Sequence, residues 1–323
     1  MRQNSHDLLK RVDLAQPLSR VLRDVARHYQ LGRLLSSRII IQGYDDLNVL
    51  LNCERGKYVA KLFNKTKSLS VVQDHIRVQQ ALTQRQAPVP RILAASAEAI
   101  YRAPGQTRDT FVCVSEYFAG ENFVRRPPCR DDMVTIARFL ATLHTLPFQV
   151  GHTHDSWGTL NLPYEFARKR AYVSEETGGL VAPLAEAVVG LKFGRARRRI
   201  IHGDLQRKHA LKNSGGHYSV LDFGCVDYNY PIVDLGVFLA LFCLLDAQPA
   251  ETQGVIRDVL DAYLALAPLP ARHIELLGEL IRATWASYLL TADFLMRQGD
   301  RTLQTRQWYH CALRSLRAFE GIL

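Results

Sequence analysis

The chain has 323 residues, 47% of them hydrophobic and 22% charged, a composition that excludes a disordered protein and suits two packed lobes. The formal net charge of +10 suits an anionic ligand such as a nucleotide, but no basic region with interleaved aromatic residues indicates a nucleic-acid-binding module. Six cysteines without Cys-x-x-Cys spacing favour neither a zinc site nor a disulfide framework.

The first part of the chain is predicted to form a small sheet accompanied by helices. Apolar residues at helical spacing between residues 7 and 31, broken near Pro17, predict one or two amphipathic helices. The pattern of residues 70–86 predicts a further helix. This helix is expected to end there because the two prolines within 87–90 force an extended backbone. The β-type runs, which predict a sheet of about five strands, are 38–42, 48–52, 57–63, 91–95 and 111–118.

After Gly120 the pattern becomes mainly helical. A helix is predicted over 131–146, and residues beyond 231 have helical spacing to the end of the sequence. Short β-type runs interrupt this region at 199–203, 210–212 and 218–223. We therefore predict an α+β protein with a small antiparallel-sheet lobe, residues 1–119, and a larger helical lobe, residues 120–323.

Two aspartates follow short β-type runs in the second lobe, in the segments His202-Gly203-Asp204 and Asp222-Phe223-Gly224. A hairpin between them would return Asp222 close to Asp204. Phosphoryl transfer needs such a pair, because one carboxylate orients the attacking hydroxyl and another holds the metal that neutralises the phosphates. Asp204 fits the first role and Asp222 fits the second.

These motifs resemble those of the aminoglycoside phosphotransferase and choline kinase superfamily, whose members are small-molecule kinases with a two-lobed, protein-kinase-like fold. Gly203 stands where the catalytic loop of protein kinases has an arginine. The resemblance covers roughly residues 37 to 243, and its further segments lie in the family's order at 58–62, 112–118, 136–147 and 231–235.

The resemblance implies that ATP and Mg²⁺ bind between the lobes. It assigns Lys61 to the α- and β-phosphates, and it makes 112–118 a hinge in which Glu116 and Phe118 bind the nucleotide. The loop 42–48 has a single glycine, and Asn48 is similar to the asparagine of a sparse phosphate-covering loop. The alternative for Asn48 is an ordinary hairpin turn with an Asx contact.

His209 departs from the family, which has at this position an asparagine whose oxygen binds metal. Imidazole binds softer metals better than it binds Mg²⁺, so Mn²⁺ is an alternative cofactor. We expect His209 to bind metal or phosphate, or else to mark a protein that has lost turnover. Gln206 and Asn213 are alternative sources of the missing oxygen ligand.

The expected acidic partner of Lys61 also departs from the family. Counting back from the Pro90 region puts His75 where a glutamate would pair with the lysine, and Asp74 is the acid beside it. Lys61 therefore pairs with Asp74 or lacks this partner. Asp45 and Asp46 would be unfavourable neighbours of a triphosphate unless they point outward, because carboxylates repel phosphates.

Other polar residues near the motifs are expected to have structural roles. Asp234 is predicted to bond loop amides near a helix start, and His144 and His202 are predicted to be structural. Trp285 and Tyr288 belong to a set of acceptor-pocket candidates, but their helical spacing favours core packing.

Together these observations predict an ATP-dependent phosphotransferase acting on a small-molecule hydroxyl. The candidate acceptors are an amino alcohol, homoserine, a sugar or an aminoglycoside-like compound. The alternative is a catalytically silent kinase-fold protein that binds nucleotide or regulates a partner. The first residues lack the apolar run of a signal peptide, and the apolar run 232–245 is too short to span a bilayer. We therefore expect a cytoplasmic protein with no membrane or nucleic-acid partner. The oligomeric state is not predicted.

Overall fold

In a computed structural model, the residues that the structure describes are 8–41, 45–95, 99–152, 154–245 and 248–320. They divide into two compact units. The sheet unit lies within residues 2–120 and also contains 213–221, a segment that the predicted boundaries gave to the second lobe. The helical unit comprises residues 121–212 and 222–323.

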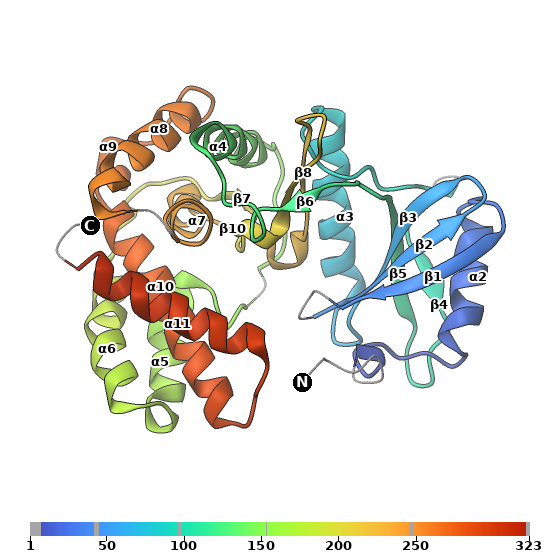
Figure 1. Ribbon diagram of the computed structural model, residues 1–323, viewed down its shortest axis with the longest axis horizontal. Coiled ribbons are helices and arrows are strands. Elements are labelled where there is room, and N and C mark those ends of the chain that lie inside the picture. The colour runs from blue at the N-terminus through green and yellow to red at the C-terminus, as the bar shows by residue number, and fades with distance from the viewer. Residues whose placement is uncertain (1–7, 42–44, 96–98, 153, 246–247, 321–323) are drawn as a thin grey trace. The chain divides into compact units, whose positions relative to one another are not determined.

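The sheet unit is built on a five-stranded antiparallel sheet with the order β1-β2-β3-β5-β4 (Figure 1). Its strands are β1 Leu34–Ile40, β2 Leu47–Cys53, β3 Gly56–Leu62, β4 Tyr101–Ala103 and β5 Thr110–Glu116. The predicted strand 91–95 lies beside β5 but forms only isolated bridges: Ile92 is opposite Ser115, and the Leu93 amide bonds the carbonyl of Val114. The fifth strand is β4, which pairs with the other end of β5. The prolines before residue 91 cannot donate ladder hydrogen bonds, which keeps this segment from extending into a regular strand.

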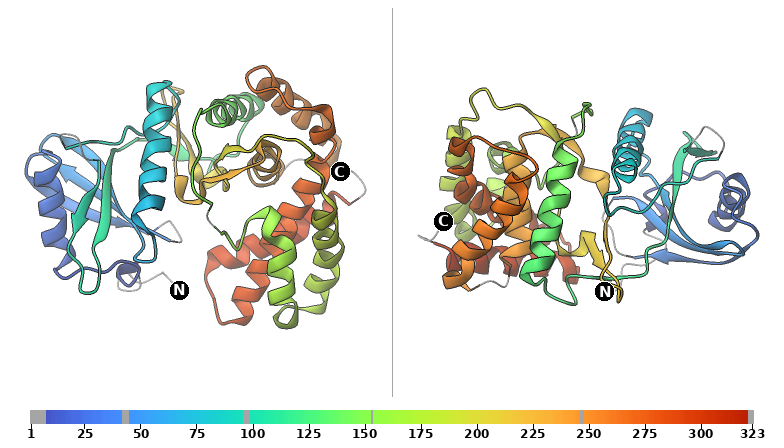
Figure 2. Two further views of the ribbon diagram at one scale, coloured as in Figure 1. Left: turned by 180° about the vertical axis from the view of Figure 1, so that it is seen from behind. Right: turned by 90° about the horizontal axis from the view of Figure 1, so that it is seen from above.

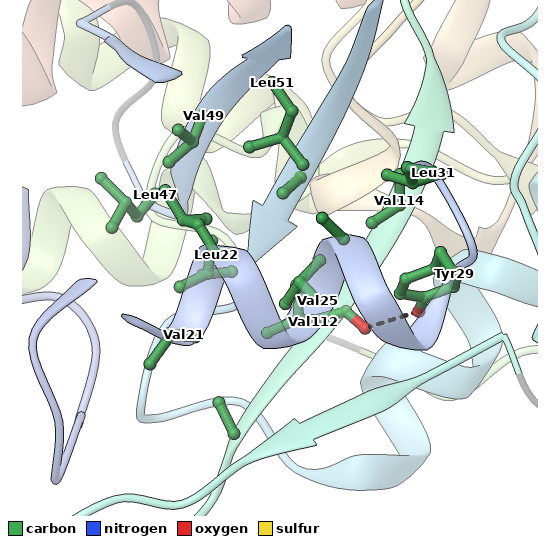
Figure 3. Packing of buried hydrophobic residues seen from close by; sticks show 14 of the residues in the cluster. Val21, Leu22, Val25, Tyr29, Leu31, Leu47, Val49, Leu51, Val112 and Val114 are labelled. Atoms are coloured by element: carbon green, nitrogen blue, oxygen red, sulfur yellow. Dashed lines mark hydrogen bonds between the residues drawn. The ribbon is translucent and has the colours of Figure 1, made fainter. Parts of the chain in front are cut away.

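Helices α2 (Leu18–His28) and α3 (Leu69–Gln84) lie on opposite faces of this sheet (Figures 1 and 2). Because strand side chains alternate between the faces, Val112 and Val114 of β5 join the core under α2, while Cys113 joins the core under α3. Figure 3 shows the core under α2, where the Tyr29 hydroxyl donates a hydrogen bond of 3.2 Å to the carbonyl of Val112. Each face of β3 and β5 therefore has a separate environment.

The helical unit packs around α10, which contacts α5, α6, α7 and α11, while α4 packs on α8. Its helices are α4 Arg130–His144, α5 Leu162–Lys169, α6 Glu175–Gly190, α7 Pro231–Phe238, α8 Thr252–Leu264, α9 Ala271–Ile274, α10 Leu277–Arg297 and α11 Leu303–Ala318. The long apolar run is α7 and the turn after it, and every residue of α7 is buried in this core. No helix in the described part of the chain is long and apolar enough to cross a membrane.

Short strands in the helical unit carry the loops of the predicted site. Strand β7 (Arg199–Ile201) pairs with β10 (Asp227–Asn229), and β6 (Glu121–Asn122) pairs with β8 (Ala210–Lys212). Strand β9 (Tyr218–Val220) belongs to the sheet unit, where the Val220 amide donates to the carbonyl of Pro88 over 2.7 Å. The small antiparallel sheet and the mainly helical second unit confirm the predicted fold class.

Candidate active site

A tight turn at the end of β7 positions Asp204. Gly203 has φ +80°, and a Cβ there would lie 2.4 Å from the carbonyl oxygen of Cys225, so only glycine fits. The buried carboxylate of Asp234 accepts hydrogen bonds from the amides of His202 (2.7 Å) and Gly203 (2.9 Å). The predicted role of Asp234 in bonding loop amides is therefore confirmed.

Asp234 is itself held by the end of α4. Its Oδ2 lies 3.0 Å from Nε2 of His144, whose Nδ1 lies 2.7 Å from the hydroxyl of Tyr263. Burial acts to raise the pKa of Asp234, but the hydrogen bonds and charge of its partners outweigh burial and lower the pKa. An ionised Asp234 thus links α4 and α7 to the turn before Asp204.

The carboxylate of Asp204 is oriented by two neutral donors. Its Oδ1 accepts hydrogen bonds from Nε2 of Gln206 (2.6 Å) and from the hydroxyl of Tyr288 on α10 (2.7 Å). Burial, and then the charge of Asp204, raise the pKa of Tyr288 well above its usual value, so the phenol remains a donor. Tyr288 is buried as predicted, but its contact with Asp204 was not predicted from the sequence. The feature that could have indicated it is the tyrosine hydroxyl on an otherwise apolar helix, since a buried hydroxyl usually has a hydrogen-bond partner.

His209 lies between the two predicted aspartates. Its Nδ1 is 2.6 Å from the backbone oxygen of Asp204, and its Nε2 is 3.3 Å from Oδ2 of Asp222. A carbonyl oxygen can only accept, so Nδ1 carries the proton and a neutral ring directs its Nε2 lone pair towards Asp222. Burial is the main cause of the lowered pKa of His209, which favours this neutral form.

The pair formed by His209 and Asp222 fits a divalent metal ion. Neighbouring ligands of one ion, each about 2.1 Å from it, lie about 3 Å apart, close to the observed separation. Within the described residues no group of three or more histidine, cysteine or acidic side chains could hold a metal. Metal ions bound with ATP usually take substrate phosphate oxygens and water as further ligands. An imidazole ligand fits Mn²⁺ better than Mg²⁺.

The two alternative oxygen donors have other roles. The Gln206 amide bonds Asp204 and also lies 3.1 Å from the Tyr288 hydroxyl. Asn213 Oδ1 accepts a hydrogen bond from the His217 amide, within a turn of the sheet unit. His209 is therefore the side chain that the structure brings to Asp222.

In the sheet unit the structure brings Asn48 and Lys61 together. They are directly opposite on β2 and β3, and Lys61 is also opposite Cys113 on β5. Since Cys113 belongs to the core under α3, the side chains of Asn48 and Lys61 share that face. Residues 42–44 of the predicted phosphate-covering loop lie outside the described residues.

Asp46 does not point outward. Only 4% of its side chain is exposed, and its Oδ2 lies 3.2 Å from Nζ of Lys61. Asp45 is more exposed and accepts a hydrogen bond of 2.9 Å from the side chain of Asn64. His75, where the family has a glutamate, packs edge-on against Phe63 with ring centroids 5.2 Å apart.

The predicted hinge follows β5. The Glu116 amide donates to the carbonyl of Arg91 over 3.0 Å, and the Tyr117 amide donates to the carbonyl of Lys57 over 3.2 Å. The Glu116 carboxylate pairs with the Arg91 guanidinium. The amide and the carboxylate of Glu116 are thus both engaged within the sheet unit, and Phe118 lies two residues beyond β5.

A cavity of about 50 Å³ lies behind the turn at Gly203 and Cys225, and its wall includes Asp155 and Asp227. It has room for a few water molecules but is far smaller than the roughly 300 Å³ of ordinary small-molecule sites.

Comparison with known proteins agrees with this geometry. A profile described as the phosphotransferase enzyme family matches residues 37–276. The homoserine kinase of Methylocella silvestris is 25% identical over 279 residues, which cover 82% of either chain.

Solved structures show the same fold. The amicoumacin kinase hAmiN superposes with a TM-score of 0.73 at 14% identity, covering 99% of this chain and 97% of its own. A microcompartment-associated aminopropanol kinase superposes with a TM-score of 0.68 at 17% identity, covering 92% and 95%. The chain therefore belongs to the phosphotransferase enzyme family and is a small-molecule kinase that uses ATP as its phosphate donor.

Proposed function

We propose that this protein transfers the γ-phosphate of ATP to the hydroxyl of a small alcohol that carries an amino group, with homoserine as the first acceptor to test. The observation that carries the proposal is the carboxylate of Asp204, which two neutral donors hold in the loop that also presents His209 to Asp222. The relatives named homoserine kinase and aminopropanol kinase support this acceptor class.

Asp204 is proposed as the residue that orients the acceptor hydroxyl and accepts its proton. Gln206 and Tyr288 both donate to Oδ1, which favours Oδ2 as the oxygen that meets the acceptor. The hydroxyl then attacks the γ-phosphorus, and the bond from this phosphorus to the β-phosphate bridging oxygen breaks to release ADP. Most of the rate gain comes from positioning and charge stabilisation.

Asp222 and His209 are proposed to hold a divalent metal, either Mg²⁺ or Mn²⁺. When bound, such an ion supplies charge neutralisation on the β- and γ-phosphates. Lys61 and Asn48 are proposed to bind the phosphates. Glu116, through its carbonyl, and Phe118 are proposed to bind the adenine. The hAmiN structure, which contains AMP-PNP and Ca²⁺, supports a nucleotide with a divalent ion in this family.

Asp155 is proposed to bind the amino group of the acceptor. It belongs to the helical unit, and the charge of Asp204 is among the causes of its raised pKa, so the two carboxylates are neighbours. Burial, the largest cause, raises this pKa to about 6, so the group is ionised at neutral pH. Trp157, two residues further on, packs against Tyr288 with ring centroids 4.9 Å apart. A carboxylate beside an aromatic surface suits an ammonium group.

A coupled ADP-release assay tests this function. Wild-type protein with ATP and either Mg²⁺ or Mn²⁺ should turn over homoserine or an aminopropanol faster than a sugar or an alcohol without nitrogen. Mass spectrometry of the product should show one added phosphate. Equal rates with and without an amino group would contradict the proposed acceptor class.

A second candidate, a silent nucleotide-binding regulator, is favoured by His209 at a position where the family has asparagine. The same assay separates it, because a silent protein would show an ATP-dependent rise in Tm but release no ADP with any acceptor. A nucleotide at a hundred times its Kd should stabilise the protein by about 2.7 kcal/mol.

A further inference from the structure

We propose that Asp46 is the carboxylate that positions Lys61, and that Lys67 shares it, so that the two lysines form one phosphate-binding pair within the sheet unit. The inference rests on the proposed function in one respect, since the anion it binds is the polyphosphate of the nucleotide. It moves the acidic partner from helix α3 to the segment before β2, and it adds a phosphate ligand that the motifs did not indicate.

The strand register brings Asp46 to Lys61. Leu47 is opposite Leu62, and Asn48 is opposite Lys61, so the residue before β2 lies beside the end of β3. Alternate residues share a face, so Asp46 lies on the same side as Asn48. Lys61 Nζ is 3.2 Å from Asp46 Oδ2, in agreement with this register.

Hydrogen bonds fix the orientation of Asp46. Its Oδ1 accepts from the amide of Asn64 over 2.9 Å, and its backbone oxygen accepts from Nη1 of Arg11 over 3.2 Å. With Oδ1 bound to the chain after β3, Oδ2 is directed to the two ammonium groups, 3.2 Å from Lys61 and 3.1 Å from Lys67. Because its side chain and its backbone oxygen are both hydrogen-bonded, Asp46 restricts the positions of both lysine ammonium groups.

The two ammonium groups are largely removed from solvent. Each lysine side chain is 12% exposed, and both ammonium groups converge on the same Asp46 oxygen. Asp45, whose side chain is 53% exposed, lies 2.8 Å from Lys67. The charge of Lys61 acts against that of Lys67, and a phosphate bound beside the two ammonium groups would offset this repulsion.

Lys67 keeps its proton in this environment. Burial acts to lower its pKa, and so does the charge of Lys61, but the charges of Asp46 and Asp45 outweigh both and raise the pKa above its usual value. The ring of Phe63 adds to this, with its centroid 5.8 Å from Nζ of Lys61 and 5.9 Å from Nζ of Lys67. Two charged ammonium groups thus share one carboxylate and one aromatic ring.

The position on α3 that would supply a carboxylate in the family does not supply one here. His75 is buried and packs edge-on against Phe63. Asp46 therefore provides from the strand side the charge that the resemblance placed on the helix. Asp74, the acid next to His75, is the competing candidate, and the experiment includes it.

The test measures the affinity of full-length protein for ATP and for inorganic tripolyphosphate by titration calorimetry, with EDTA and then with Mg²⁺. We expect Lys67→Met and Asp46→Asn each to weaken both affinities about tenfold or more, since hydrogen bonds to charged groups contribute about 1.5–3 kcal/mol. Lys67→Arg should restore most of the affinity. Lys65→Met removes a charge from an exposed position two residues away, and should change the affinities less than twofold.

Asp46 is further distinguished by comparing it with Asp74. If Asp74→Asn loses ATP affinity while Asp46→Asn binds like wild type, the assignment of Asp46 is wrong. If Asp46→Asn does not fold, as judged by circular dichroism, Lys67→Met still decides: wild-type affinity for ATP and tripolyphosphate in that variant would overturn the lysine pair.

The outcomes separate this inference from the proposed function. Turnover of an acceptor by wild type, together with unchanged nucleotide affinity in Lys67→Met and Asp46→Asn, would contradict only the inference. Loss of tripolyphosphate binding in Lys67→Met, with no acceptor phosphorylated by wild type, would support the inference and contradict the function. Absence of nucleotide and tripolyphosphate binding in wild type would contradict both.

Discussion

The two units hold their predicted site residues in different ways. In the helical unit, the loop residues Asp204, His209 and Asp222 come together, and Asp234 of α7 fixes the turn before Asp204. In the sheet unit, Lys61 meets its carboxylate across the β2–β3 register. The loops of the helical unit keep the two aspartates of the family's motifs and depart from the family at His209, whereas in the sheet unit the carboxylate beside the lysine comes from a different element.

The largest expected effect tests the site residues of the helical unit. Asp204→Asn removes the proton acceptor but keeps an oxygen for Gln206 and Tyr288, so we expect kcat to fall about a thousandfold while ATP affinity stays within about twofold. The ADP-release assay and calorimetry measure the two quantities. Asp258→Asn, which alters a surface ion pair with Arg130, is the matched control. Turnover above a tenth of wild type would refute the role of Asp204.

His209→Asn tests whether this half of the site departs from its family in metal preference. Replacing an imidazole nitrogen with an amide oxygen should favour Mg²⁺, so we expect the ratio of Mg²⁺-supported to Mn²⁺-supported kcat to rise about tenfold. Rates at saturating concentrations of each metal give this ratio. An unchanged ratio would show that His209 is not a ligand.

Tyr288→Phe tests the hydrogen bond from Tyr288 to Asp204, which the apolar pattern of α10 did not predict. Loss of the hydroxyl leaves Oδ1 of Asp204 with only Gln206, so we expect kcat to fall about tenfold with little change in KM for ATP. Tyr309→Phe on α11 is the control and should behave like wild type. A fall confined to stability, with unchanged kcat, would leave Tyr288 as a core residue only.

The smallest effect concerns the pH dependence of stability through Asp155. Its pKa is about 6 in the folded protein against a usual value of 3.8, so ionisation destabilises the fold above pH 6, and this cost disappears as the pH falls towards 3.8. We expect Asp155→Asn to unfold a few degrees higher than wild type at pH 8, a gain of about 1–3 kcal/mol, and at the same Tm near pH 4. The variant amide can still accept the Trp157 hydrogen bond.

Thermal unfolding followed by circular dichroism at the two pH values gives this difference. The same variant should raise KM for homoserine, because the acceptor's ammonium loses its carboxylate. Higher stability at pH 8 with an unchanged KM would place Asp155 outside the acceptor site. Lower stability at pH 8 would contradict the raised pKa.

The sequence by itself determined the features that depend on short segments. The two aspartate motifs and the helical character after residue 120 follow from residue types at close spacing along the chain. The amide-bonding role of Asp234 was also predicted, although the amides that it binds lie 32 and 31 residues earlier. The ordered motifs also predicted the family that the profile match confirmed.

The tertiary structure decided the features that depend on which elements meet. Strand β4 forms where no strand was predicted, the segment 213–221 packs with the sheet unit, Asp46 turns inward to the lysines, and Tyr288 reaches Asp204. The apolar period of a strand or helix shows which face is buried, but it does not show which element packs on that face. Pairing across strands and packing between helices supply that partner, and they placed the residues on which Lys61 and Asp204 depend.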